Sequence, residues 1–468
     1  NFYDFLVDTN VINHVKKMKE LDLTQGNVVK VLFQFALPYL LANVLQALYG
    51  GADLFVVGQF DDAASVAGVA IGSQVMQTVT GIILGLTTGI TVLIGIATGA
   101  RNYKELVAVI GSSVWLFALI GIVLTSLMVL CHDPITSVMH TPAEAMQDTQ
   151  AYLLIASLGI PFIIGYNVVC GILRGIGDSR TPLYFVLLAC IINIVLDFLL
   201  VGAFHLRAAG AALATISSQG ISFVTALWFL HRRGFSFPFT RKDIRLNGLL
   251  SRRIMVLGAP IALQDALVNI SFLIITVIVN QMGVITSAAL GVVEKVIVFA
   301  MLPPVAISSA VAAMTAQNYG AGLIERMNRC LYAGIGMALV FGVSMCVYSQ
   351  FFPENWIRIF TEDEAVISMG ATYLRGYSID CILVSFIFCM NSYFSGQGNS
   401  WFPMVHSLIA TFLFRIPLSW LFSHIDPTSL FWMGFAPPLS TVVSLVICLF
   451  YLYWWQKKLA VKIQIHNS

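Results

Sequence analysis

The sequence predicts an all-α polytopic membrane protein, with twelve transmembrane helices in two parallel repeats of six. Three observations lead to this fold class. The 468 residues are 58% hydrophobic and only 10% charged, whereas soluble domains are roughly 45–50% apolar and about 25% charged. The apolar residues extend over the whole chain, whose mean hydropathy is +0.86. Landmarks of the first half also recur in the second half.

Twelve apolar stretches are long enough to be membrane spans, because about 20 such residues cross a bilayer. Some stretches are much longer, so we expect those helices to tilt or to extend beyond the bilayer. The expected spans are residues 31–58, 63–99, 105–130, 148–173, 181–203, 208–230, 253–281, 286–317, 324–350, 365–394, 401–423 and 429–455.

Basic residues indicate which ends of the spans face the cytoplasm. With a cytoplasmic N-terminus, twenty of the twenty-five Lys and Arg residues fall in cytoplasmic segments, and only Arg207 and Arg358 fall outside. This bias follows the positive-inside rule, so both termini are expected in the cytoplasm. The rule also accounts for the basic central loop, residues 231–253, without any binding to nucleic acid. No cleavable signal peptide is expected, since residues 1–22 lack an apolar core.

The two halves carry the same landmarks 221 residues apart. The recurring residues are Tyr152 and Tyr373, Pro182 and Pro403, and the runs 174–178 and 395–399. Six spans separate equivalent helices, so the repeats are parallel, and a substrate site is expected near mid-membrane between them. The expected organisation is a cytoplasmic segment (1–30), an amino-terminal lobe (31–230), a cytoplasmic linker (231–253), a carboxy-terminal lobe (254–455) and a cytoplasmic tail (456–468).

The first span contains the residue that organises the rest of the prediction. In residues 36–59 the only charged side chain is Asp53, and a carboxylate at membrane depth is costly enough to indicate a functional site. Pro38 and the Gly50-Gly51 pair give this helix places to bend. The second half has Ile275 where Asp53 would recur, so the two halves differ here.

Four motifs stand out: ALPYLLANVLQALYGGADLFVVGQF in the first span, GILRGIGDSRTP after the fourth, NIVLDFLLVG in the fifth and AQNYGAG after the eighth. Together they resemble the multidrug and toxic compound extrusion (MATE) family over nearly all of the chain after about Leu23. The resemblance implies a V-shaped fold of two six-helix lobes that exports organic cations and other toxic compounds while Na⁺ or H⁺ enters. Within the family, the chain is also similar to an exporter of a genotoxin precursor (precolibactin), although no single motif carries that likeness.

The resemblance also implies roles for individual residues. Asp53, Asn193, Asp197 and Thr215 are similar to the amino-terminal cation site of the family's DinF-like branch, and Pro38 is similar to that branch's hinge proline. Two carboxylates, an amide oxygen and a hydroxyl suit a hard cation such as Na⁺. Two neighbouring carboxylates in a low dielectric can hold a proton instead. The alternative is that Asp53 and Asp197 only cap or bridge helices.

Two further sets of polar residues are candidates for binding. The first could line the substrate cavity or simply join helices, and it comprises Gln46, Tyr49, Asn167 and Gln219. The NorM-like branch of the family has an acidic cation site in its carboxy-terminal lobe. The residues that could form a polar site there are Asp265, Glu294, Lys295 and Asp380. Asp265 and Asp380 lie about a turn from the expected places, so a second cation site stays open.

Several function classes are excluded. The sequence lacks GxxxxGK[ST], so ATP does not drive the chain directly, and its closely spaced glycines do not follow a strand as a dinucleotide fingerprint would. The eight Cys residues form no CxxC pair, and the His residues are scattered. We therefore expect no enzyme and no cofactor, only a coupling ion.

The leading interpretation is a secondary active efflux transporter in the bacterial inner membrane, monomeric and surrounded by lipid. It would exchange Na⁺ or H⁺ for amphiphilic, often cationic compounds by alternating access. A flippase for a lipid-linked precursor is the alternative, but anionic headgroups favour a basic cavity, and only Lys295, Arg375 and Arg415 lie within spans. A channel or receptor is the third reading. Ion-gradient-dependent uptake into inverted vesicles separates these three.

Overall fold

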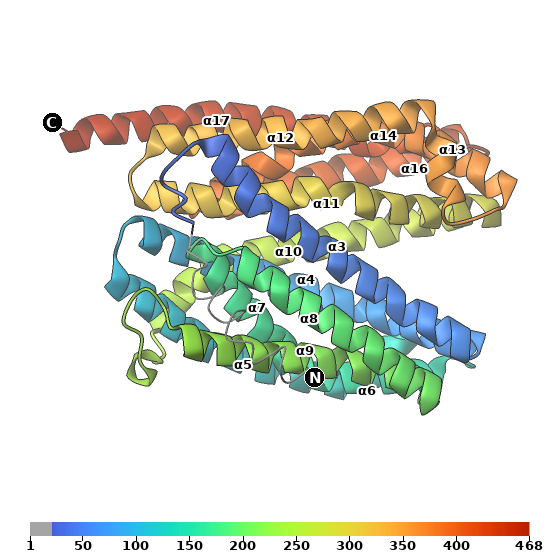
Figure 1. Ribbon diagram of the computed structural model, residues 1–468. Coiled ribbons are helices and arrows are strands. Elements are labelled where there is room, and N and C mark those ends of the chain that lie inside the picture. Colours follow the sequence, from blue (N-terminus) through green and yellow to red (C-terminus); the bar gives the residue numbers. More distant parts are fainter. Residues whose placement is uncertain (1–20, 140, 468) are drawn as a thin grey trace. The chain divides into compact units, whose positions relative to one another are not determined.

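The computed structural model describes residues 21–139 and 141–467, and within this part every regular element is a helix (Figure 1). The helices of the first half are α3 (Val28–Phe60), α4 (Ala63–Gly99), α5 (Tyr103–Val138), α6 (Met146–Leu158), α7 (Ile160–Gly175), α8 (Arg180–Asp197), η1 (Phe198–Ala203) and α9 (Arg207–Arg233). Those that follow are η2 (Arg241–Asp243), α10 (Gly248–Asn280), α11 (Val284–Gly320), α12 (Ile324–Phe351), α13 (Pro353–Arg358), α14 (Glu364–Gly396), α15 (Trp401–Leu408), η3 (Ile409–Arg415), α16 (Ile416–Ile425), η4 (Met433–Phe435) and α17 (Ala436–Asn467).

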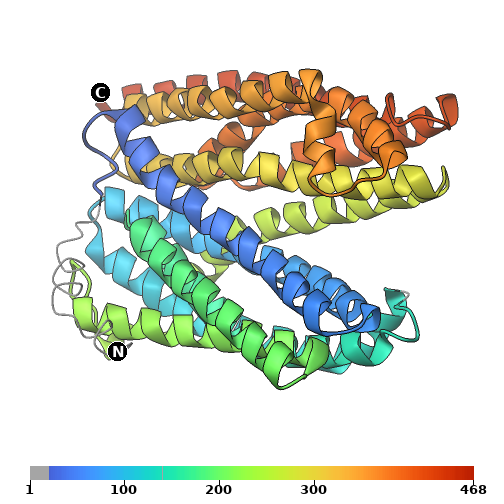
Figure 2. The ribbon, with the colours of Figure 1, turned by 45° about the vertical axis from the view of Figure 1, so that its right-hand side comes forward.

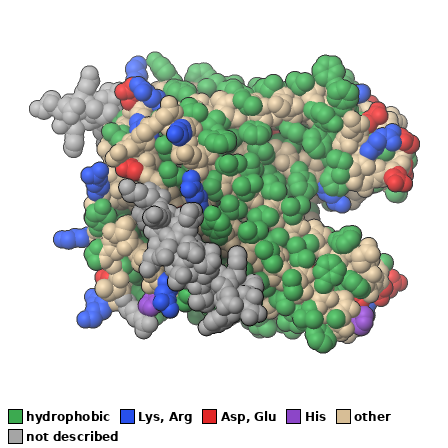
Figure 3. Space-filling view, in the orientation of Figure 1, with side chains coloured by type: hydrophobic (Ala, Val, Ile, Leu, Met, Phe, Trp, Pro, Cys, Tyr) green, Lys and Arg blue, Asp and Glu red, His purple; other side chains and the backbone are tan. Residues whose placement is uncertain are grey.

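The predicted fold class is confirmed. Eleven spans in the described residues are long and apolar enough to cross a membrane, and the bent pair α6–α7 makes a twelfth. Hydrophobic side chains cover the helix flanks, while charged side chains gather near the helix ends (Figure 3). The fourth expected span, 148–173, differs from the prediction because it bends by 48° at Gly159. A Cβ at Gly159 would overlap Ile216 of α9, and Pro161 lies in the first turn of α7.

The described chain divides into two compact units. One extends to Met255 and also includes residues 316–323, whereas the other comprises 256–315 and continues from Ile324. The central linker belongs to the first unit, since Trp115 of α5 donates a hydrogen bond to the carbonyl oxygen of Ile244 (3.1 Å). The guanidinium of Arg253 pairs with Glu105 at 2.6 Å. These contacts fix the linker against α5.

The internal repeat is visible in the backbone. Gly177 and Gly398, which the sequence pairs, both have positive φ angles, of 100° and 87°. A side chain is disfavoured there, because only Gly adopts such angles at low cost. Gly175 packs against Ile94 of α4, and its partner Gly396 packs against Thr315 of α11. The same spacing therefore produces the same helix ending in each repeat.

The ends of α4 and α11 approach each other through a second pair of glycines. A Cβ added at Gly99 would collide with the carbonyl oxygen of Gln317, and one added at Gly320 would collide with that of Ile96. Both contacts lie within the first unit, to which residues 316–323 belong. The absence of side chains at these two positions lets the backbones touch.

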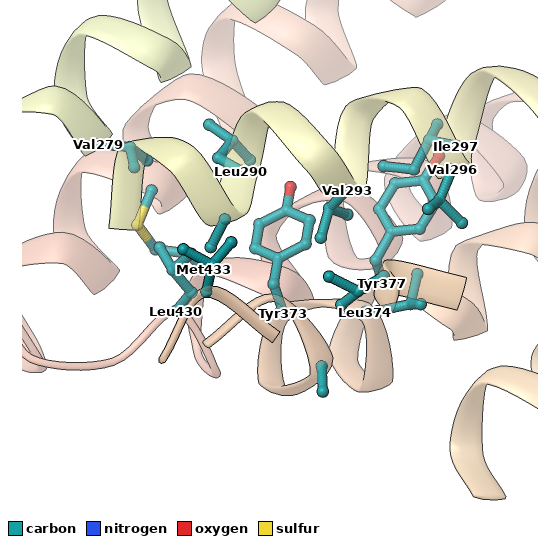
Figure 4. Packing of buried hydrophobic residues seen from close by; sticks show 14 of the residues in the cluster. Val279, Leu290, Val293, Val296, Ile297, Tyr373, Leu374, Tyr377, Leu430 and Met433 are labelled. Carbon is teal, nitrogen blue, oxygen red and sulfur yellow. The ribbon is translucent and has the colours of Figure 1, made fainter. Parts of the chain in front are cut away.

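Each unit buries its own interior. In the first, α3 lies beside α8, and α8 lies beside α9 (Figure 2). In the second, Val293 and Leu290 of α11 pack against Tyr373 and Tyr377 of α14 (Figure 4). A π-helical turn, η1, follows α8, and another, η3, interrupts the eleventh span. Such turns are frequent at functional sites.

We expect Gly342→Ala in α12 to destabilise the protein. Its Cβ would collide with the carbonyl oxygen of Cys381 and lie 2.7 Å from the Ser385 hydroxyl oxygen on α14. Overpacking of this kind lowers the free energy of unfolding by about 1–3 kcal/mol. The midpoint of thermal unfolding in detergent should therefore be lower in the variant than in the parent. Gly336→Ala in the same helix is the matched control, since nothing lies within 4 Å of its Cβ. Equal loss in both variants would contradict the close approach of α12 and α14.

Candidate cation-binding site

Asp53 meets residues of α8 and α9 in the first unit. Its side chain is 5% exposed. The Thr215 hydroxyl of α9 donates a hydrogen bond to Asp53 Oδ2 at 3.0 Å, and Asn193 Nδ2 of α8 donates to Thr215 Oγ1 at 3.5 Å. Asp197, one turn beyond Asn193, is completely buried, and its carboxyl interacts with that of Asp53. The structure therefore brings all four residues of the expected cation site together from three helices.

Several oxygens of this cluster lack a donor. Within the described residues, the buried atoms without a hydrogen-bond partner include Asp53 Oδ1, Asn193 Oδ1 and both carboxyl oxygens of Asp197. Buried polar atoms are normally satisfied, so this concentration calls for an explanation. No Lys or Arg of the described chain interacts electrostatically with either of the two carboxyls. A sodium ion or a proton would supply the missing positive charge.

Tyr152 of α6 also belongs to this neighbourhood, although sequence analysis used it only as a landmark of the repeat. Its buried phenol interacts with Asp53 and Asp197 and lies beside Thr215. The ring occupies the space that Gly72 of α4 leaves, because a Cβ there would overlap it. The repeat could have indicated this role for Tyr152, because the equivalent Tyr373 interacts with the acidic residues Glu294 and Asp380 of the second unit.

The four residues expected to line a substrate cavity separate into two groups. Gln219 Nε2 donates a hydrogen bond to the Tyr49 hydroxyl at 3.3 Å, and Gln46 lies beside the same hydroxyl. Tyr49 is one turn from Asp53, so this polar group adjoins the cation cluster. Asn167 instead donates its amide N–H to the carbonyl oxygen of Ile163 at 2.8 Å, within its own helix. Its amide nitrogen is thus engaged by the backbone.

The second unit does not gather all of its candidate residues. Asp265 and Lys295 are exposed in the described chain, and neither makes a hydrogen bond or an ion pair through its side chain there. Glu294 and Asp380, by contrast, share the influence of Arg415. Arg415 is the last residue of η3 in the eleventh span, and no spacing in the sequence links it to the two acids.

Pro38 lies inside α3, which remains one helix from Val28 to Phe60. Proline lacks an N–H, so the carbonyl oxygen of Gln34 loses its usual helical donor. Further along, Cβ atoms at Gly50 and Gly51 would meet nothing within 4 Å. The helix that carries Asp53 therefore has one weakened hydrogen-bonding position and an unpacked stretch just before the carboxylate.

An ionic cluster ties together helix ends beyond α3. Arg207, at the start of α9, pairs with Asp62 at 2.8 Å and with Asp148 at 3.2 Å. Asp62 caps α4 by accepting a hydrogen bond from the Ser65 N–H at 2.9 Å. That bond, together with Arg207, holds the pKa of the Asp62 carboxyl below its usual value. The cluster joins the amino-terminal ends of α4, α6 and α9.

The contribution of Asp62 to stability should disappear in acid. A carboxyl whose pKa is lower in the folded state stabilises the protein above the unfolded pKa, about 3.9, and loses that effect as the pH falls through the folded value. The unfolding temperature of the parent should exceed that of Asp62→Asn at pH 7, and the difference should shrink as the pH falls below about 3.9 and vanish below the folded pKa of Asp62. Asn keeps the helix cap, so a difference independent of pH would contradict the ionic role.

Comparisons with known proteins agree with this architecture. A family profile described as MatE matches residues 38–199 and again residues 260–421, so the two halves belong to one kind of repeat. The probable multidrug resistance protein YpnP of Bacillus subtilis is 30% identical over 87% of this chain and 91% of its own length. The probable multidrug resistance protein NorM of Thermotoga maritima is 26% identical over 92% of this chain and 93% of its own.

Solved structures show the same fold. A transporter of the MOP superfamily from Pyrococcus furiosus superposes with a TM-score of 0.87, at 20% identity, over 94% of this chain and 99% of that one. An outward-facing multidrug resistance transporter gives a TM-score of 0.87, at 21% identity, over 95% and 98% of the two chains.

Proposed function

Because this chain belongs to the MATE family, whose members are transporters and not enzymes, we propose that it is a secondary active exporter. It exchanges Na⁺ or H⁺ for amphiphilic, often cationic organic compounds by alternating access. Family membership confirms the expectation that the chain has no enzymatic activity. The organic substrate is a small molecule, as for multidrug transporters generally.

The observation that carries the proposal is the group of buried oxygens without donors around Asp53. Asp53 and Asp197 supply carboxylates, and Asn193 and Thr215 supply neutral oxygens from the neighbouring helices. A buried carboxylate that lacks a positive partner is strongly destabilised unless an ion or a proton neutralises it. The cluster is therefore suited to holding one coupling ion and to releasing it when water enters.

The same cluster provides the coupling to the substrate. When the carboxyls are neutralised, α3 can pack closely against α8, and when they are ionised, that packing is unfavourable. An ion shifts such an equilibrium only by binding one packing more tightly than the other. Tyr49, Gln46 and Gln219 lie next to the cluster on α3 and α9, so a substrate that contacts them competes with close packing. Ion and substrate thus favour opposite states of the first unit.

The substrate preference follows from the charges within the spans. When the charged residues near the ends of the spans are left out, acidic residues outnumber basic ones, five to three; they are Asp53, Asp197, Asp265, Glu294 and Asp380 against Lys295, Arg375 and Arg415. This excess favours cationic or neutral compounds over anionic lipid headgroups. A natural-product precursor of amphiphilic character falls within the same class. The protein is proposed to act as a monomer in the bacterial cytoplasmic membrane, with both termini in the cytoplasm.

Inverted vesicles test the proposal directly. Uptake of a fluorescent organic cation should follow an imposed Na⁺ or H⁺ gradient and should stop when the matching ionophore collapses that gradient. A flippase for lipid-linked precursors would instead move anionic lipid without the gradient, and a channel would equilibrate the cation without accumulating it. Accumulation that persists after the gradients collapse would overturn the proposal.

A further inference from the structure

The second unit contains a polar cluster that resembles the Asp53 cluster in composition. Glu294 of α11 and Asp380 of α14 supply two carboxylates, and the hydroxyls of Thr276 and Thr441 lie beside them, respectively. Asp380 is 5% exposed. Glu294 Oε1 and Asp380 Oδ1 are buried, and neither has a hydrogen-bond partner in the described chain. Both units therefore hold two carboxylates with unsatisfied oxygens and neighbouring hydroxyls.

The difference between the clusters is a guanidinium. Arg415, on the π-helical turn η3, acts electrostatically on Glu294 and on Asp380. Its Nε is itself buried without an acceptor in the described chain. Around Asp53 and Asp197, the unsatisfied atoms are all oxygens. The second cluster thus contains a positive group of its own.

Packing holds this guanidinium close to the acids without pairing it with either one. Its central carbon lies 4.2 Å from the centroid of the Phe272 ring of α10, a cation–π contact. No ion pair within 4.0 Å joins it to either carboxylate in the described residues. Tyr373 and Tyr377 both project from α14 (Figure 4), and their rings are stacked with centroids 6.2 Å apart. Both tyrosines also interact electrostatically with Arg415. The charge is therefore shared between the two acids.

We propose that Arg415 is a tethered cation that serves the carboxylates of the second unit in place of a diffusible ion. A guanidinium among Glu294, Asp380 and the two tyrosines repels a second cation at short range. The coupling ion is then confined to the Asp53 cluster, which has no basic partner. This inference rests on the proposed function in assigning the ion to Asp53, and it adds the number of ions: one per chain.

Sodium binding to purified protein tests the inference, with radioactive Na⁺ as the probe and Asp53→Asn as the background. Asp53→Asn alone should bind no Na⁺. Asp53→Asn with Arg415→Gln should gain one Na⁺ per chain, because the two carboxylates lose their resident cation. Adding Asp380→Asn should abolish this gain, and Asp53→Asn with Arg415→Lys should bind none, because the positive charge is kept.

Thermal unfolding gives a second readout that does not depend on radioactive counting. Na⁺ should raise the unfolding temperature of Asp53→Asn/Arg415→Gln and leave Asp53→Asn unchanged, since a ligand stabilises only the state that binds it. If Asp53→Asn/Arg415→Gln fails to fold, Asp53→Asn/Arg415→Met can take its place. Its control is Asp53→Asn/Arg415→Met/Glu294→Gln, which lacks one of the two carboxylates and should bind no Na⁺. A folded double variant that binds no Na⁺ overturns the inference, as does Na⁺ binding to Asp53→Asn that a further Asp380→Asn change removes. Na⁺ binding to Asp53→Asn that Asp380→Asn leaves in place would instead contradict the proposed role of Asp53.

Discussion

Asp53→Asn and Asp197→Asn are each expected to abolish gradient-driven efflux while leaving the fold intact. Each change removes one of the two buried carboxylates that neutralise the coupling ion, and Asn keeps nearly the same volume. The cluster then loses its differential affinity for the ion between the two packings of α3, and without such a difference an ion drives nothing. Transport in inverted vesicles should fall to the level of empty vesicles.

Stability should respond in the opposite direction. Both carboxyls are buried, and both Asp197 oxygens lack donors in the described chain, so a neutral amide removes part of the cost of burial. The unfolding temperature should stay the same or rise, because functional sites often contain groups that lower the stability of the fold and their replacement can raise it. The stabilisation by added Na⁺ or by acid that we expect in the parent should disappear. Robust transport by both variants would refute the assignment, whatever their stability.

The control for this experiment is Asp133→Asn. It makes the same chemical change on α5, where the Asp133 side chain is 64% exposed, and it should leave transport unchanged. A comparable loss in Asp133→Asn would show that the assay responds to expression or insertion and not to the cluster.

The second large effect concerns the shape of α3. Neutralising the Asp53 cluster is expected to move the outer part of α3 toward α8, with the weakened hydrogen bonding at Pro38 absorbing the change. Spin labels at Phe55 and Val195 suit this measurement, since both side chains face outward and are 63% and 60% exposed. The distance between them should change when Na⁺ is added or the pH is lowered.

Two variants separate the switch from the hinge. Asp53→Asn should remove the response, because the cluster no longer changes charge. Pro38→Ala should reduce it, because Ala restores the N–H donor to the carbonyl of Gln34 and stiffens the helix. Cys131 should be replaced by Ser before labelling, since it is the free cysteine of the described chain that is not buried. An unchanged distance response in both variants would rule out this motion even if export itself were retained.

Local patterns predicted much of this structure, for identifiable reasons. Hydropathy reveals each membrane span because every span must bury about 20 residues in lipid by itself. The spacing that pairs Gly177 with Gly398 marked equivalent positions in the two repeats, and both have positive φ, which is a property of the local backbone. The bend at Gly159 escaped prediction because it depends on Ile216, a contact between helices that are distant in sequence.

The polar clusters were predictable only in part, for the same reason. Asn193 and Asp197 share a helix face through their spacing, whereas the position of Asp53 beside them came from a resemblance. Nothing in the sequence near Arg415 relates it to Glu294 or Asp380, which lie on other helices. Tyr152 was visible as a repeated residue, but its phenol meets Asp53 only through the packing of α6 on α4.

The paired glycines at the ends of α4 and α11 bear on how such a chain could have arisen. Gly99 contacts Gln317, and Gly320 contacts Ile96. The repeat makes Gly99 equivalent to Gly320 and Ile96 equivalent to Gln317, so the two contacts are equivalent to each other. The contact is therefore self-complementary, like an isologous interface between two identical subunits. A shorter protein carrying one repeat would form this contact only by pairing with a second copy of itself. Fusion of the two copies would preserve the contact, and only then could the halves diverge, one keeping a bare pair of carboxylates and the other acquiring an arginine.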